Sequence, residues 1–315
     1  MLTKRIVVIK IKPDKITALK RRIILENFFY LDNGTIKVRI LYPDGVKYDR
    51  SRWCHTGFIQ DVWCNGARFS EYERNRHNEQ LTSEGCGLCC GFFPIAPGED
   101  EPGKLTILPG DGVGTVKAPN AEKDRLNITE HFDIKVSFDK TSAVFETKTP
   151  CVNGYAYSET RKIELCGSEI KENVTFKNIG EKEIHTREFC HNFLSLPGME
   201  ISPDYVLEVF AVDAPEGFCN NAMVFENGHF TFLRHPERTC YFDHKQNGKY
   251  CDDYAWIMKS KSGKASCYGK IDFTPVRVSV WSDYYTLCPE IFVGIDLLPG
   301  EEKTWQRTWG FSLGE

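Results

Sequence analysis

Short apolar runs recur along the chain, and residues that favour turns separate them. Each run is rich in Val, Ile, Phe, Thr or Tyr and is bounded by Gly, Asn, Asp or Pro, which is typical of β-strands. Along residues 170–176 apolar and polar side chains alternate, as a half-buried strand requires. The predicted strands are residues 6–11, 35–41, 58–64, 105–108, 134–138, 162–165, 170–176, 205–212, 223–233 and 277–281.

The turn signals between these runs favour hairpins. Four tripeptides carry the Asn or Gly that tight turns require: Asp32-Asn33-Gly34, Asn178-Ile179-Gly180, Glu226-Asn227-Gly228 and Gln246-Asn247-Gly248. Residues 15–29 repeat apolar side chains at helical spacing, so a short helix or a strand fits there, and 110–124 is the best loop candidate. Strands do not alternate with long helical patterns, which disfavours a parallel sheet. We predict one all-β domain over 1–315, antiparallel, with at most a few short helices.

Composition and charge disfavour two classes of binding partner, nucleic acids and membranes. The 315 residues carry a net charge of −4, and Lys and Arg are spread along the chain, so nucleic acid is an unfavourable partner. The first fifteen residues are too interrupted by Lys for a secretory segment, and no run has transmembrane length, which indicates a cytoplasmic protein without a membrane partner. In a reducing compartment most of the 13 cysteines are expected to be small buried hydrophobes.

Residues 174–198 contain the first candidate for chemistry, His191. A strand ends in the 178–180 turn, and a second strand then delivers Glu188, Cys190, His191 and Phe193. An imidazole held between Phe189 and Asn192 can exchange a proton near neutral pH, although a core histidine bonded to a carbonyl fits the same window. Neighbouring strand residues point to opposite faces, so Cys190 and His191 are not expected to form a nucleophilic pair.

The second candidate is Glu290, which follows Pro289 and precedes apolar residues. A carboxylate against apolar surface has a raised pKa and becomes a useful general base. An ordinary glutamate at a strand edge is the alternative.

These two segments together resemble the galactose mutarotase (aldose 1-epimerase) superfamily. The strand, the N-x-G-E turn at 178–181, the next strand and the H-x-F of 191–193 look like the family's hallmark around its acid histidine. The segment LCPEIFVGIDLLPGEEKTWQRTWGF resembles the family's terminal segment. The resemblance covers the last 140 or so residues and is weaker before them. It implies a β-supersandwich, Glu290 as base on the anomeric hydroxyl, His191 as acid on the ring oxygen, and neither metal nor organic cofactor.

The resemblance also implies residues that hold the sugar. Asp253 is the preferred match to a family aspartate that binds hydroxyl groups, although Asp243-His244 matches the letters better; Trp256 is a stacking candidate or a core aromatic. Further pocket candidates are Arg52, His55, Arg76 and His77.

One departure from the family pattern concerns residues 83–93. They correspond to an early His-Gly-Gly-like segment but contain no histidine. Their cysteines, Cys86, Cys89 and Cys90, lack the second ligand pair of a zinc site, so packing under a glycine-rich turn is the favoured interpretation.

The sequence therefore favours an aldose 1-epimerase-like isomerase acting on a small carbohydrate. A non-catalytic carbohydrate-binding protein on the same fold remains an alternative. A third is a glycoside-active sandwich in which Glu290 and Asp253 are paired carboxylates. The particular sugar and the oligomeric state are left open.

Overall fold

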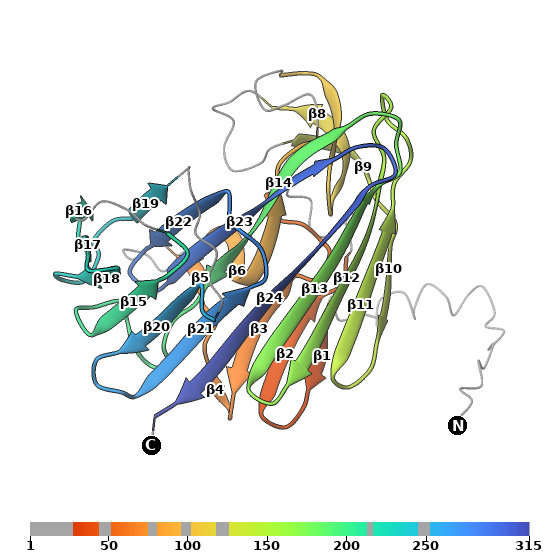
Figure 1. The fold of residues 1–315 in the computed structure, drawn as a ribbon. Coiled ribbons are helices and arrows are strands. Elements are labelled where there is room, and N and C mark those ends of the chain that lie inside the picture. Colours follow the sequence, from red (N-terminus) through yellow and green to blue (C-terminus); the bar gives the residue numbers. More distant parts are fainter. Residues whose placement is uncertain are drawn as a thin grey trace, which may run out of the picture.

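The computed structural model of the protein describes residues 28–43, 52–74, 81–95, 102–117, 126–212, 217–244 and 253–314. Within this part of the chain the regular structure is antiparallel β-strand, without a helix. Two large sheets face each other, and a small third sheet lies at one end (Figure 1). The predicted all-β antiparallel sandwich is confirmed. No helix in these residues is long and apolar enough to cross a membrane.

The first sheet contains the strands that carry the candidate site. In spatial order its strands are β1 (Phe28–Asp32), β2 (Ile36–Leu41), β3 (Ile59–Cys64), β6 (Leu81–Phe92), β14 (Ile184–Phe193), β23 (Leu287–Leu297), β22 (Arg277–Ser282) and β19 (Cys240–His244). Two short strands lie off this path, β4 (Ala67–Arg68) beside β3 and β5 (Tyr72–Arg74) beside β6.

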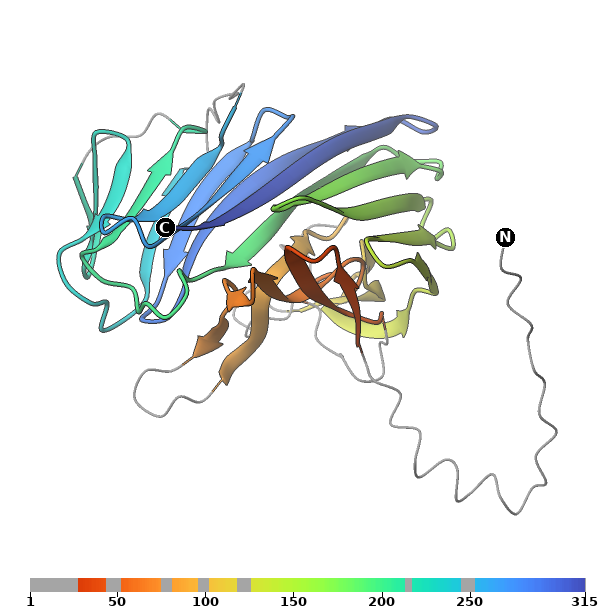
Figure 2. The same cartoon turned by 90° about the horizontal axis from the view of Figure 1, so that it is seen from below.

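The second sheet forms the other layer of the sandwich, which Figure 2 shows from a second direction. Its order is β10 (Ile134–Phe138), β11 (Ser142–Lys148), β12 (Tyr157–Cys166), β13 (Glu169–Asn178), β24 (Glu302–Leu313), β21 (Ala265–Ile271), β20 (Trp256–Ser260), β15 (Tyr205–Val209), β18 (His229–Phe232), β17 (Met223–Glu226) and β16 (Gly217–Asn220). The small sheet is β7 (Leu105–Leu108), β8 (Gly112–Val116) and β9 (Leu126–His131).

Asn178 joins the two turns through which the chain passes between the large sheets. The turn after β13 leads into β14, and the turn after β23 leads into β24. The Asn178 side-chain amide donates to the carbonyls of Lys182 and Leu297, while its own carbonyl accepts from the amide of Gly300. The two segments that carry the sequence resemblance therefore meet at one end of the sandwich.

The burial pattern along each strand shows which of its faces are covered. Strand β13 alternates intermediate and buried positions along its whole length, as expected for a strand with one face on the core. Strand β14 differs, because every residue from Phe189 to Phe193 is buried. This end of β14 is therefore covered on both faces, with Cys190 in the inner core and Phe189 and Phe193 in a separate outer apolar cluster.

The interior between the two large sheets also holds buried charges. Arg161 of β12 binds Glu159, Glu172 and Glu188 at 3.0, 2.7 and 2.9 Å. Arg307 of β24 binds the other oxygen of Glu188 at 2.5 Å. Burial alone would raise the pKa of Glu188, but the two guanidinium groups hold it below its ordinary value. These contacts tie β12, β13, β14 and β24 together inside the sandwich.

Three sequence predictions are corrected. Residues 110–124 are not a continuous loop, because 112–116 form β8 and pair with both neighbours. Residues 83–92 are not a turn but belong to β6, a strand of 12 residues. The predicted strand 223–233 is two strands, joined by the predicted turn at Asn227 and Gly228, both with positive φ. The strand predicted at 6–11 and the turn at 246–248 lie outside the described residues.

Candidate active site

His191 and Glu290 face each other across two neighbouring strands. The β14–β23 register runs from Ile184 opposite Leu297 to Phe189 opposite Phe292, and the bridge between Leu194 and Leu287 continues it. This register places His191 directly opposite Glu290. His191 Nε2 lies 3.4 Å from Glu290 Oε1, with side-chain exposures of 5% and 8%. The fold thus brings together, as a buried histidine–carboxylate pair, the two side chains that the sequence singled out.

A row of polar side chains continues from this pair toward the edge of the sheet. Glu290 is paired with Ser279 of β22, and Ser279 is paired with Asp243 of β19. The Ser279 hydroxyl donates to Asp243 Oδ1 at 3.0 Å, and Arg277 Nε donates to the same oxygen at 2.6 Å. Directly opposite residues share a face of a sheet. The row His191–Glu290–Ser279–Asp243 therefore lies on one face, and Asp243 and Arg277 at its end are 18% exposed.

Aromatic rings surround His191. Its imidazole stacks on Phe193, with centroids 4.0 Å apart and an angle of 12° between the planes. Trp53 and Trp281 meet the imidazole edge-on at 5.4 and 5.5 Å. Trp281 is only partly buried. The rings fix the orientation of the imidazole and leave Nε2 directed at Glu290.

Glycine on β6 makes room for these rings. A Cβ at Gly85 would lie 2.5 Å from Phe193 and 3.1 Å from Trp53, which is too close for any side chain. Four residues further along β6, Cys89 pairs in register with His191. Burial raises the pKa of the Cys89 thiol well above its ordinary value. The cysteines of β6 are buried free thiols, in agreement with the packing interpretation.

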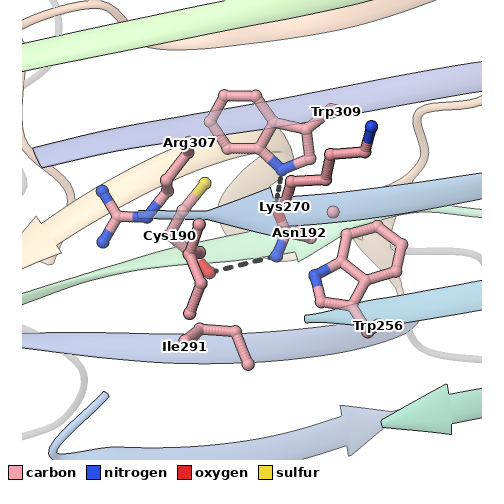
Figure 3. A pocket seen from close by; sticks show the side chains of 9 residues that line it. Cys190, Asn192, Trp256, Lys270, Ile291, Arg307 and Trp309 are labelled. Atoms are coloured by element: carbon pink, nitrogen blue, oxygen red, sulfur yellow. Dashed lines mark hydrogen bonds between the residues drawn. The ribbon is translucent and has the colours of Figure 1, made fainter. Parts of the chain in front are cut away.

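The other face of β14 looks into the sandwich. Cys190 and Asn192 line a small cavity together with Trp256, Ile291 and Trp309, as Figure 3 shows. The Asn192 amide oxygen accepts from Trp309 Nε1 at 2.8 Å. Cys190 and His191 point to opposite faces, as predicted. Trp256 is 2% exposed and belongs to the inner core, so the structure does not place this predicted stacking residue beside His191.

The remaining predicted site residues are scattered. Asp253 is exposed and precedes β20 in the second sheet, so it does not join the row or pair with Glu290. Arg52 lies over the Trp53 ring at 4.3 Å and binds Glu73 at 2.9 Å, which places it at the margin of the site. His55 turns toward Asp111 instead. Arg76 and His77 lie outside the described residues.

Four site residues were not found by sequence reasoning: Trp53, Arg277, Ser279 and Trp281. Arg277, Ser279 and Trp281 are every second residue of the predicted strand 277–281. This spacing indicates that their side chains share one face of the sheet, and it is the signal in the sequence that could identify them together. Asp243 matches the letters of the family aspartate better than Asp253 does, but it lies farther in sequence from the strands that follow. Its position beside β22 depends on a long-range pairing that periodicity does not report.

Solved structures, but not sequences, show similarity to this protein. No family model matches the sequence, and no curated protein matches it. Among solved structures, a galactose mutarotase related enzyme from Lactobacillus acidophilus superposes with a TM-score of 0.58 at 14% identity, covering 91% of this chain and 98% of that one. A putative aldose 1-epimerase from Escherichia coli K12 gives 0.53 at 12% identity, covering 91% and 99%. A galactose mutarotase-like protein from Lactobacillus casei gives 0.57 at 12% identity, covering 90% and 100%.

These likenesses extend over nearly the whole chain. They show that the chain has the galactose mutarotase-like fold, in a divergent form, as the sequence resemblance implied.

Proposed function

We propose that the protein is an aldose 1-epimerase-like isomerase that interconverts the anomers of a small carbohydrate, with Glu290 as base and His191 as acid. The buried His191–Glu290 contact of 3.4 Å carries the proposal. The anomeric hydroxyl and the ring oxygen are bound to the same carbon, so an acid and a base that serve both must be close neighbours. Two groups in opposite protonation states on one face of a sheet meet that requirement.

His191 and Glu290 return to their starting protonation states after one catalytic cycle. Glu290 takes the proton of the anomeric hydroxyl, the electron pair forms the carbonyl, and the bond from the anomeric carbon to the ring oxygen breaks. The ring oxygen takes the proton of His191. After rotation of the carbonyl carbon, His191 removes that proton again, the ring closes on the other face, and Glu290 returns its proton. Each transfer contributes roughly 10²–10⁴-fold to the rate.

The row beyond Glu290 supplies binding groups for the rest of the sugar. Asp243 and Arg277 offer a hydrogen-bond acceptor and donors at the partly exposed end of the row. Trp281 is partly buried beside them and offers an aromatic face to the apolar side of the ring. In this arrangement the anomeric carbon lies at the buried end and the distal hydroxyls lie at the exposed end.

Anomer exchange measured by NMR, across a panel of free and phosphorylated aldoses, tests the proposal. Glu290→Gln and His191→Asn are each expected to reduce kcat/KM by about 10²–10⁴-fold. Asp296→Asn and His185→Asn are matched controls, because this pair bridges the same two strands at an exposed position. We expect the controls to keep wild-type rates. Equal losses in controls and site variants would contradict the assigned roles.

A non-catalytic carbohydrate-binding protein is the second candidate. The observation that favours it is the missing histidine of residues 83–93. The residue of this segment that pairs in register with His191 is Cys89, whose buried thiol cannot replace an imidazole in proton transfer. Sugar binding that Asp243→Asn weakens, without any acceleration of anomer exchange, would favour this candidate over the isomerase.

A further inference from the structure

We propose that His55, Asp111 and His131 form a binding site for a divalent transition-metal ion of the zinc class. The three side chains come from separate parts of the chain. His55 precedes β3, Asp111 lies in the turn between β7 and β8, and His131 ends β9. The site is separate from the His191–Glu290 pair and goes beyond the proposed isomerase activity.

The separations between the ligand atoms suit one small ion. Asp111 Oδ1 lies 2.9 Å from His131 Nδ1 and 4.0 Å from His55 Nε2. All three ligand atoms lie within 4.8 Å of one another. Tetrahedral ligands at zinc-to-nitrogen distances of about 2.0–2.1 Å are about 3.4 Å apart. Shifts of about half an ångström in His131 and His55 would bring both nitrogens to that distance from Asp111 Oδ1.

The backbone around Asp111 is fixed before any ion arrives. Gly110 accepts from the amide of His55 at 2.7 Å, and Asp111 accepts from the amide of Phe132 at 2.9 Å. A Cβ at Gly110 would lie 2.3 Å from Cys54, and one at Gly112 would lie 2.2 Å from the carbonyl of Glu130. Glycine on both sides of Asp111 therefore lets three segments approach closely enough to bring their ligands together.

Burial and charge favour a cation here. Asp111 is fully buried, and its Oδ2 has no hydrogen-bond partner among the described residues. A buried carboxylate requires a compensating charge, and a metal ion supplies one. The His131 side chain is 29% exposed, so an ion and its water ligand can reach the site from solvent. Two imidazole nitrogens and one carboxylate, with a further position for water, are a ligand set that zinc accepts.

A second cluster shows why the first is the better site. Cys90, Glu172 and Glu188 also lie within metal-binding distance of one another. Arg161 and Arg307 already neutralise those carboxylates. No guanidinium is paired with Asp111 in the described part of the chain.

An ion at this site would also hold the segment that leads into β3. Trp53, two residues before His55, packs edge-on against His191. Metal binding would therefore fix one wall of the candidate active site without contacting substrate.

Titration of the metal-free chain with Co²⁺, followed by displacement with Zn²⁺, tests the proposal. We expect visible d–d bands of a four- or five-coordinate site and a melting temperature that rises with metal concentration. Loss of a second-shell group weakens metal sites by about 10–100-fold, so His131→Gln and Asp111→Asn should weaken Co²⁺ binding at least about tenfold. His185→Gln removes an exposed histidine that pairs with Asp296 and is the matched control.

Three results would overturn the site: no Co²⁺ binding, equal affinity in the wild type and His131→Gln, or a thiolate charge-transfer band that persists in His131→Gln. The last would indicate binding by cysteines. Because His131 is partly exposed, His131→Gln is expected to fold, which circular dichroism checks. That variant decides the outcome even if Asp111→Asn does not fold.

Discussion

Two histidine–carboxylate pairs bridge β14 and β23 in the same register and on the same face. His185 faces Asp296 at one end, and His191 faces Glu290 six residues further along β14. The outer pair is the closer one, at 2.7 Å against 3.4 Å. It is also the exposed one, with side-chain exposures of 61% and 73% against 5% and 8%.

The difference shows that proximity alone does not define a reactive pair. Water surrounds the His185–Asp296 pair, so its charges are screened and the pair contributes little. Around His191, three aromatic rings exclude water and fix the imidazole. The hydrogen bonds and electrostatic interactions of a side chain are stronger where water is excluded. Burial on both faces of β14 is therefore what separates the candidate site from an ordinary surface contact.

The largest effect is expected where charge is most deeply buried, between the two sheets, where Arg161 of β12 meets Glu188 on the inner face of β14. Arg161→Met leaves Glu159, Glu172 and Glu188 with less compensation inside the sandwich. Breaking a buried ion pair by removing one partner costs about 3–5 kcal/mol. We expect a loss of that size in the free energy of unfolding, measured by urea denaturation.

Lys162→Met is the control for that change. Lys162 is the next residue on β12, and its ion pair with Glu164 is 45% and 35% exposed. Exposed pairs contribute about 0–1 kcal/mol. If the two variants lose equal stability, burial is not what distinguishes these charges.

A smaller effect is expected from Asp243→Asn, which tests how far the polar row extends. Hydrogen bonds to charged groups contribute about 1.5–3 kcal/mol, so sugar affinity or KM should weaken roughly 10–100-fold. Asp253→Asn should leave both unchanged, because Asp253 is exposed and precedes β20, a strand of the other sheet. Isothermal titration calorimetry, with the aldose of the panel that binds most tightly, distinguishes the two variants. A loss confined to Asp253→Asn would restore the assignment favoured by sequence.

The smallest effect belongs to the exposed pair. The hydrogen bond to Asp296 raises the pKa of His185 above its ordinary 6.5. Its contribution is therefore fully present below that value and is lost as pH rises through the folded pKa. Wild type should exceed His185→Asn by less than about 1 kcal/mol in mild acid, and the difference should vanish in mild alkali. Urea denaturation at low salt checks this, and a difference that grew with pH would refute the sign.

The sequence by itself determined the class of fold and singled out two candidate side chains that the fold brings together. Strand periods and turn residues depend on near neighbours, so residues 134–138 and 105–108 were predicted with the bounds of β10 and β7. His191 and Glu290 were found through local motifs, and those motifs meet because Asn178 joins their turns. Local chemistry of this kind can be read from one window of the chain.

Only the tertiary structure decided which residues surround that pair. Trp281 joins it through the pairing of β22 with β23, and Asp243 through the pairing of β19 with β22. Trp256, an equally plausible aromatic by sequence, lies in the inner core. Likewise β6 resembles a turn by sequence because it is rich in glycine, yet Gly85 leaves room for Trp53 and Phe193, and Gly91 leaves room for Phe189. Strand order and close approach depend on contacts between residues far apart in the chain, and hydrophobic periodicity carries no information about them.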